Sequence, residues 1–187
     1  RVLFRSLLRR TLLYLGLPNA ESLWFPFAVQ RGKRLLAEQH YDVLYSRAFS
    51  PVSHMVALTL KRISGCPWVA HWGDPWVDSP YFKPRGLQRR TCLRLEEQIM
   101  RAADAIEFIT PQAADLVMAK YPPSWRAKVH ISPHAYDPAS LPVVQPVGNR
   151  DGRLHLVHTG RFYGQRSPEP LLRALALLKA RRNLAGE

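Results

Sequence analysis

The chain has 187 residues, of which 47% are hydrophobic, and a formal net charge of +13. This length suits one domain, or one domain with part of a second, and the hydrophobic share is sufficient for a buried core. The charge favours anionic partners such as nucleic acid, phosphorylated substrates or anionic lipid headgroups, but it does not choose among them. The sequence has no polybasic tract and no aromatic RNA-binding signature. A nucleic-acid partner would rest on charge alone, and we expect none.

Several other classes of protein are disfavoured. Cys66 and Cys92 lack the spacing of metal ligands, and no histidine pair has a convincing ligand spacing, so we expect core cysteines and no protein-bound metal. No apolar run reaches the ~18 residues that a membrane span needs. Residues 1–17 carry arginines, but no small-residue cleavage site follows them, which argues against a signal peptide. A cytoplasmic location is expected.

The chain opens with two predicted helices. Apolar residues crowd one broad face over residues 2–15, with arginines elsewhere, and Pro18 and Asn19 end this pattern. The segment fits either a helix that packs on the core or an interfacial helix that faces anionic lipid. A second helix is expected from Trp24 to about Gln39.

Alternating strands and helices come next. Strands are predicted at 42–46, 67–71, 105–109 and 129–131, and helices at 50–63, 84–103 and 110–120. Ser50 with Pro51 and Thr110 with Pro111 are typical helix starts, and Gly65 is a typical helix end. This order predicts an α/β fold, a Rossmann-like parallel sheet with flanking helices.

The loops that follow the first two strands are the expected ligand site. Doubly wound sheets bind ligands at the carboxyl ends of their strands. Ser46 and Arg47 end or follow the first strand, and an aromatic, polar loop over 72–82 follows the second. This placement locates a site without naming a reaction.

The last quarter of the chain is predicted to begin a second domain. Residues 139–152 are rich in Pro, Gly, Asn and Asp without periodicity, which is typical of an interdomain linker. A strand at 154–158, a tight turn and a helix that opens at Ser167 and Pro168 follow. We therefore expect one domain over 1–138 and the start of another over 153–187.

Taken in order, these segments resemble retaining family-4-type glycosyltransferases. The resemblance is carried by Asp42–Ser46, Pro67–Ala70 with Asp74–Trp76, Leu95–Ile99 with Ala103–Ala105 and Thr110, Lys128–Ile131, and Val157–Tyr163. It covers most of residues 22–180 and rests on the ordered set rather than on any one motif. It implies the GT-B architecture of two Rossmann-like domains that face each other across a cleft. It also implies that the chain is an internal piece: the later part of the acceptor-side domain, the linker, and the start of the sugar-nucleotide-side domain.

The resemblance assigns the donor diphosphate to the turn near residue 160. Gly160 lets backbone approach a phosphate, and Arg161 can hold a diphosphate through two hydrogen bonds. In the family an arginine and then a lysine in this loop do this work. Arg161 matches the arginine, whereas the lysine has no clear match; Arg166 is near, and Ser167 could occupy its place. The alternative is that Arg161 and Arg166 are solvated loop charges.

On the acceptor side, Asp74 is the candidate catalytic residue. Its carboxylate could accept hydrogen bonds from acceptor hydroxyls or orient a neighbour, and the alternative is an Asx turn before proline. Trp72 and Trp76 could stack on a sugar or a lipid-linked acceptor, or else pack the loop onto the core. The family often has a histidine at the end of this strand, where this chain has Gly73, and His71 lies two residues earlier.

Ser46 and Arg47 complete the candidate substrate-binding residues. His54 is expected to be a core or helix-surface histidine, and Glu97 and Asp104 are expected to serve helix pairing and strand entry.

The resemblance implies a retaining, metal-independent glycosyltransferase. It would move a sugar from a nucleotide-sugar donor to a hydroxyl of a polysaccharide, a glycan or a lipid-linked acceptor, without a further cofactor. The alternative is a non-catalytic α/β module that binds an anionic or nucleotide ligand. We also expect peripheral contact with an anionic membrane, and no activity of these 187 residues alone.

Overall fold

The computed structural model describes residues 20–48, 51–141, 155–163 and 166–184. The chain divides into two compact units, Arg1–Tyr136 and Asp137–Glu187. The predicted helix over 2–15 lies outside the described residues, and each unit is treated by itself below.

The first unit is an α/β domain whose four strands form one parallel sheet in the order β1-β2-β3-β4. Its elements are η1 (Ala20–Trp24), α2 (Phe25–Glu38), β1 (Leu44–Ala48), α3 (Val52–Ser64), β2 (Trp68–Trp72), α4 (Gly86–Ala102), β3 (Ala105–Phe108), α5 (Pro111–Met118), η2 (Pro123–Lys128) and β4 (Val129–Ile131). The predicted Rossmann-like sheet with flanking helices is confirmed. The first strand ends two residues later than predicted, so that Arg47 lies within it.

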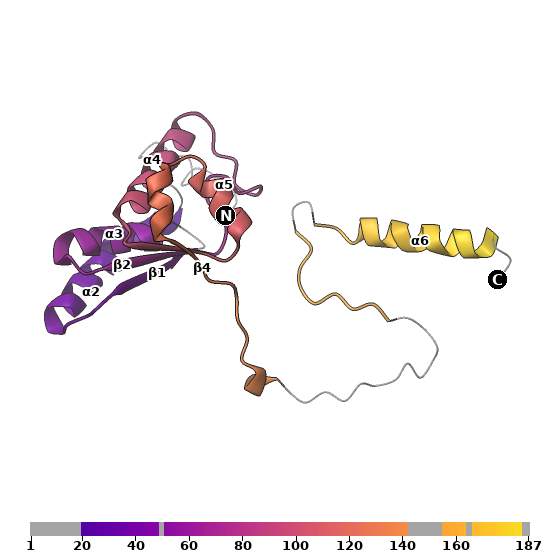
Figure 1. Cartoon of the computed structure of the whole chain (residues 1–187), viewed down its shortest axis with the longest axis horizontal. Coiled ribbons are helices and arrows are strands. Elements are labelled where there is room, and N and C mark those ends of the chain that lie inside the picture. The colour runs from indigo at the N-terminus through magenta and orange to yellow at the C-terminus, as the bar shows by residue number, and fades with distance from the viewer. Residues whose placement is uncertain (1–19, 49–50, 142–154, 164–165, 185–187) are drawn as a thin grey trace. The chain divides into compact units, whose positions relative to one another are not determined.

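One face of this sheet carries the hydrophobic core. Right-handed crossovers between strands in sequential order place the connecting helices on the same face, and Figure 1 shows α4 and α5 on one side of the sheet. The core joins Trp68, Ala70 and Trp72 of β2 and Ile106 and Phe108 of β3 to residues of α3, α4 and α5. The opposite face carries the alternate strand residues.

Short local signals set the boundaries of the helices. Gly65, with φ 72°, ends α3 in the left-handed conformation that favours glycine. The Thr110 side chain caps α5 by accepting a hydrogen bond from the Ala113 N–H, as the sequence predicts. The start of α3 differs, because Pro51 takes the N-cap position without a side-chain hydrogen bond.

Asp104 connects the entry of β2 to α3. Its carboxylate accepts a hydrogen bond from the Trp68 N–H at 2.6 Å and pairs with Lys61. This contact agrees with the predicted role in strand entry. Glu97 pairs with Arg101 one turn along α4, at 2.6 Å.

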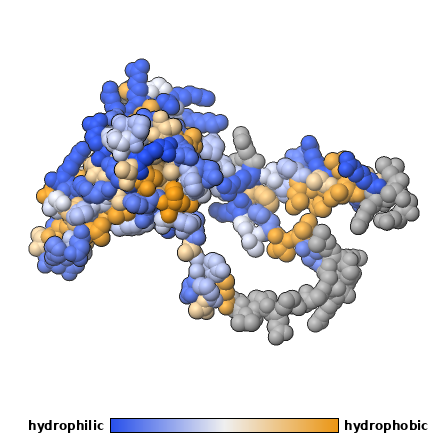
Figure 2. Space-filling model, viewed as in Figure 1, coloured by the Kyte–Doolittle hydropathy of each residue, from blue (hydrophilic) through white to orange (hydrophobic). Residues whose placement is uncertain are grey.

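In the second unit, η3 (Pro138–Ser140) and α6 (Glu169–Leu184) are the regular elements that the structure describes. The predicted helix that opens at Ser167 and Pro168 is confirmed as α6, and Figure 2 shows hydrophobic side chains along it. The predicted strand at 154–158 is wrong for its described part, because residues 155–158 are exposed and irregular. A strand needs a neighbour for its backbone hydrogen bonds, and the described part of this unit contains no other strand.

Among the described residues, no helix has the length and apolar character to cross a membrane.

Candidate functional site

The carboxyl ends of the four strands lie at one edge of the sheet. The register aligns Ala48, Trp72, Phe108 and Ile131 as neighbours, each at the last position of its strand. Because the strands are parallel, the loops that leave them meet at this edge. The candidate residues Ser46, Arg47, Trp72 and Asp74 therefore belong to the same region.

Ser46 faces the covered side of the sheet, where it connects two buried aromatic side chains. Its Oγ accepts a hydrogen bond from the Trp68 indole N–H at 2.7 Å and lies 2.7 Å from His54 Nδ1. Burial, and to a smaller extent the nearby His71, lower the pKa of His54 to about 3, so His54 is neutral at neutral pH. Ser46 is only 6% exposed. This geometry gives Ser46 a structural role and confirms His54 as a core histidine.

Trp72 also points into the core rather than toward a ligand. It is 1% exposed, and its ring centroid lies 4.4 Å from that of His54. The expectation that Trp72 stacks on a sugar is not supported, because alternation along β2 turns its ring beneath α3. Its Nε1 and the His54 Nε2 are buried without a hydrogen-bond partner in the described structure.

The open side of the sheet carries a second polar cluster, formed by Tyr45, His71 and Glu107 from three adjacent strands. Glu107 Oε2 accepts a hydrogen bond from the Tyr45 hydroxyl at 3.2 Å and lies 3.2 Å from His71 Nδ1. Burial and the negative charge of Glu107 raise the pKa of Tyr45. Arg47 is the register neighbour of His71 on this side and is exposed.

Sequence reasoning singled out His71 but missed its partners Tyr45 and Glu107. Alternation within each strand is the signal that could have found them. In β1, Tyr45 and Arg47 lie on either side of the buried Ser46, and in β3 Glu107 lies between the buried Ile106 and Phe108. Pairing these residues also requires the register between strands, which a single sequence does not supply.

The loop after β2 carries Asp74 and Trp76. Asp74 is exposed, so its carboxylate is open to solvent. Trp76 packs against the core and stacks on Phe82, with the ring centroids 6.3 Å apart and the planes 9° from parallel. For Trp76 this contact favours the packing alternative over sugar stacking.

Glu96 on α4 fixes this loop. The Glu96 side chain is fully buried. One of its carboxylate oxygens accepts a hydrogen bond from Lys120 and another from the Tyr121 hydroxyl, the second at 2.7 Å. The other oxygen accepts from the Val77 N–H at 3.3 Å, and Lys120 also pairs with Asp78. Burial and the Glu96 charge raise the pKa of Tyr121. These contacts attach the Asp74 loop to α4 and to the residues after α5.

In the second unit, the turn at Gly160 has a backbone that favours glycine, with φ 148°. Arg161 is exposed, and the Arg166 guanidinium lies 4.6 Å from the centroid of the Tyr163 ring. Gly160, Arg161 and Arg166 are thus exposed residues of the segment that precedes α6.

In the comparison with protein-family models, residues 5–133 match the model described as "Glycosyl transferase 4-like domain". The chain belongs to this family. No curated protein and no solved structure matches it. The matched range contains all four strands and the Asp74 loop of this glycosyl transferase 4-like domain, and it ends before Arg161.

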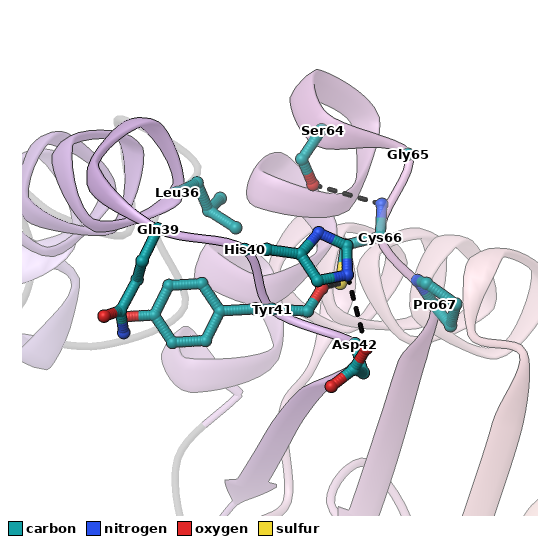
Figure 3. A pocket seen from close by; sticks show the side chains of 9 residues that line it. All are labelled: Leu36, Gln39, His40, Tyr41, Asp42, Ser64, Gly65, Cys66 and Pro67. Carbon is teal, nitrogen blue, oxygen red and sulfur yellow. Dashed lines mark hydrogen bonds and ion pairs between the residues drawn. The ribbon is translucent and has the colours of Figure 1, made fainter.

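A small pocket of the glycosyl transferase 4-like domain lies at the opposite, amino edge of the sheet (Figure 3). It is lined by Leu36, Gln39, His40, Tyr41, Asp42, Ser64, Gly65, Cys66 and Pro67. His40 and Asp42 pair at 3.2 Å, and the Cys66 thiol contacts the Tyr41 carbonyl at 3.3 Å. Since Asp42 precedes β1 and Pro67 precedes β2, this pocket is separate from the predicted site. Within the described ranges no three His, Cys, Asp or Glu side chains group as metal ligands.

Proposed function

We propose that the protein transfers a sugar from a nucleotide-sugar donor to a hydroxyl group of an acceptor. The observation that carries this proposal is the family match over the parallel sheet, together with an exposed carboxylate at the sheet's carboxyl edge. Fold alone does not determine a reaction, so the proposal depends on the residues of the site.

Asp74 is the proposed catalytic residue of the acceptor side. An exposed carboxylate can accept a hydrogen bond from the acceptor hydroxyl and orient its oxygen toward the sugar. The Glu96 contacts with Val77 and, through Lys120, with Asp78 restrain the loop that carries Asp74. A restrained loop loses less conformational entropy when substrate binds. Arg47, exposed beside this edge, is a further contact for the acceptor.

Gly160, Arg161 and Arg166 are the proposed contacts for the donor. Cleavage of the bond between sugar and diphosphate leaves negative charge on the departing diphosphate. Fixed guanidinium groups stabilise that charge as it develops, which lowers the barrier. In this proposal, arginines supply the positive charge without a metal ion or a further cofactor.

Arg161→Ala tests the donor assignment. Turnover is followed as release of nucleoside diphosphate from a panel of UDP-, GDP- and dTDP-sugars, with the protein expressed from its full reading frame. Loss of one charge-stabilising group should lower turnover by on the order of 10²-fold. The matched control is Arg173→Ala, because Arg173 is exposed on α6 and pairs with Glu169 at 2.5 Å. Equal turnover of the two variants would remove Arg161 from the site.

Asp74→Asn tests the acceptor assignment in the same assay. The amide keeps the size of the side chain but loses the charge, so transfer to the acceptor should fall while donor binding stays constant. Asp115→Asn is the control, since Asp115 is an exposed carboxylate on α5 that pairs with Arg126. A protein that binds nucleotide-sugars but releases no diphosphate with any acceptor would instead be a binding module.

We further propose that the protein works at the cytoplasmic face of a membrane on a lipid-linked acceptor. The net charge of +13 supports attraction to anionic lipid.

A further inference from the structure

Three large apolar side chains are exposed together where η1 meets α2. Leu23 is 52% exposed, Trp24 45% and Phe27 73%. Single exposed apolar residues are common on protein surfaces, but these three lie within five residues of sequence. Two of them are aromatic, and Trp is a residue type that concentrates at membrane–water interfaces.

The contact between α2 and α3 fixes which side of α2 faces outward. Gly32 lies against α3 so closely that a Cβ there would come 2.5 Å from Leu60 Cδ1. Trp24, Phe27, Arg31 and Arg34 follow at spacings of three, four and three residues, which place them on one stripe of the helix. All four are exposed. We call this set, with Leu23, the α2 outer stripe; it is apolar at its start and basic toward its end.

The basic part of the stripe is available for an anionic partner. Arg34 has no ion pair within the described ranges, and Arg31 reaches Glu38 only at 3.8 Å. Each Lys or Arg near an anionic bilayer contributes about 1 kcal/mol of attraction, and inserted Trp, Phe and Leu side chains add burial of apolar area. The apolar side chains therefore match the hydrocarbon interior of an anionic bilayer, and the basic side chains match its negatively charged surface.

The direction of α2 relates this stripe to the candidate site. The helix ends at Glu38, and only five residues separate it from the start of β1 at Leu44. The carboxyl end of α2 therefore lies near the amino edge of the sheet, where Leu36 lines the pocket of Figure 3. With 14 residues, α2 is about 20 Å long, so its beginning lies toward the carboxyl edge. Leu23, Trp24 and Phe27 are thus on the side of the domain that carries the strand ends.

We propose that the α2 outer stripe docks this domain onto an anionic lipid bilayer, with Leu23, Trp24 and Phe27 inserted and Arg31 and Arg34 on the lipid phosphates. The docking itself does not depend on the reaction. Its consequence for the reaction rests on the proposed function: the Asp74 edge would face an acceptor hydroxyl held at the membrane surface by its lipid.

Vesicle co-sedimentation of the 187-residue chain tests the proposal without an activity assay. The probe is a vesicle of phosphatidylcholine with phosphatidylglycerol, compared with phosphatidylcholine alone, at low and at high salt. The chain should sediment with the anionic vesicles and be released by salt. Trp24→Ser with Phe27→Ser should lower the partition coefficient about tenfold or more. Arg31→Gln with Arg34→Gln should lower it about fivefold for each charge.

Matched variants on another surface serve as controls. Leu87→Ser with Leu116→Ser removes two exposed apolar side chains, and Arg89→Gln with Arg90→Gln removes two exposed charges, all outside the stripe. These variants should bind vesicles as the unmodified chain does. Circular dichroism of each variant establishes that it is folded.

Three results would overturn the proposal. One is equal loss of binding in the stripe and control variants, which would mean attraction by net charge alone. Another is vesicle binding that appears only after deletion of residues 1–19, which would make that segment the occupant of the stripe. The third is a dimer in light scattering that Trp24→Ser with Phe27→Ser makes monomeric without changing vesicle binding, which would identify the stripe as a contact between copies.

Discussion

The two faces of the sheet place neighbouring residues in opposite environments. Phe108 on the covered face is fully buried in the core, whereas Glu107, one position earlier in β3, lies on the open face with its side chain 25% exposed. On the covered face the Ser46 hydroxyl lies inside a network, between Trp68 and His54. The open face holds charged and titratable groups in a row across the sheet.

The covered face of the sheet therefore contributes mainly to the stability of the domain, and the open face carries the groups that could act on a ligand. Parallel sheets that are covered on both faces usually have near-continuous hydrophobic strands. Here the strands alternate, and Arg47, His71 and Glu107 are neighbours in the register of the open face. Substitutions on the covered face should therefore act mainly on folding. Substitutions on the open face should leave the fold largely intact, which makes it the better place to look for effects on ligands.

The largest expected effect comes from Phe108→Ala, which leaves a cavity in the core. Substitutions of this kind cost about 3–5 kcal/mol of unfolding free energy. Val69→Ala on the open face is the comparison, and it should cost about 1 kcal/mol because Val69 is only half-buried. Urea unfolding followed by circular dichroism measures both. Equal costs would mean that the open face is covered in solution as well.

The second effect concerns the polar network of the covered face. Ser46→Ala removes the hydroxyl that accepts from the Trp68 indole and leaves the His54 Nδ1 without its partner. Buried groups that lose their partners cost about 1–3 kcal/mol. Ser53→Ala is the control, because Ser53 is only half-buried and its hydroxyl donates to the Arg47 carbonyl; its cost should be smaller. A Ser46→Ala protein as stable as the original would show that water replaces the hydroxyl.

The architecture was predictable from sequence because its signals are local. Gly65 and Thr110 mark helix boundaries through their own backbone and side-chain chemistry, and these assignments are confirmed. The end of β1 was placed too early because Arg47 is polar, although an edge strand with one open face accommodates it. The strand at 154–158 failed for a different reason: an apolar pattern does not show whether a neighbouring strand is present.

The sequence was sufficient to predict the location of the candidate site, but not the environment of its side chains. Sequence reasoning located the carboxyl edge, but it left Trp72 open between sugar stacking and core packing, although alternation turns the ring into the core. Sequence reasoning also missed the contacts that restrain the Asp74 loop. Glu96 binds Lys120 and Tyr121, which lie 24 and 25 residues later in the sequence. Such contacts depend on the packing of α4 against the chain after α5. The roles of Asp74 and Arg161 stay predictions.

The third effect is a pH dependence that originates at His54. Burial lowers the pKa of His54 to about 3, against an ordinary value of 6.5, so only the unfolded chain takes up its proton between these values. The unfolded state then binds more protons, and stability falls as pH falls through this window. From about pH 7.5 to about pH 5.5 this should cost about 1.4 kcal/mol.

Comparison with His54→Gln isolates this contribution from those of the other histidines. The difference in unfolding free energy between the two proteins is measured by urea denaturation at each pH. It should shrink by about 1.4 kcal/mol as the pH is lowered, since glutamine does not titrate. A difference independent of pH would mean that His54 can take up a proton within the folded domain.

The smallest expected effect is that of Glu107→Gln on the open face. Glutamine keeps an oxygen that can accept from the Tyr45 hydroxyl, while the charge that faces His71 is lost. Because the Glu107 side chain is partly exposed, the loss of unfolding free energy should stay below about 1 kcal/mol. The Tyr45 pKa should fall toward its ordinary value, because the charge of Glu107 helps to raise it. Ultraviolet titration of the tyrosines measures this shift, with Tyr45→Phe identifying the titration of Tyr45. A cost as large as that of Phe108→Ala would erase the distinction between the two faces, because it would make the open cluster as important for folding as the core.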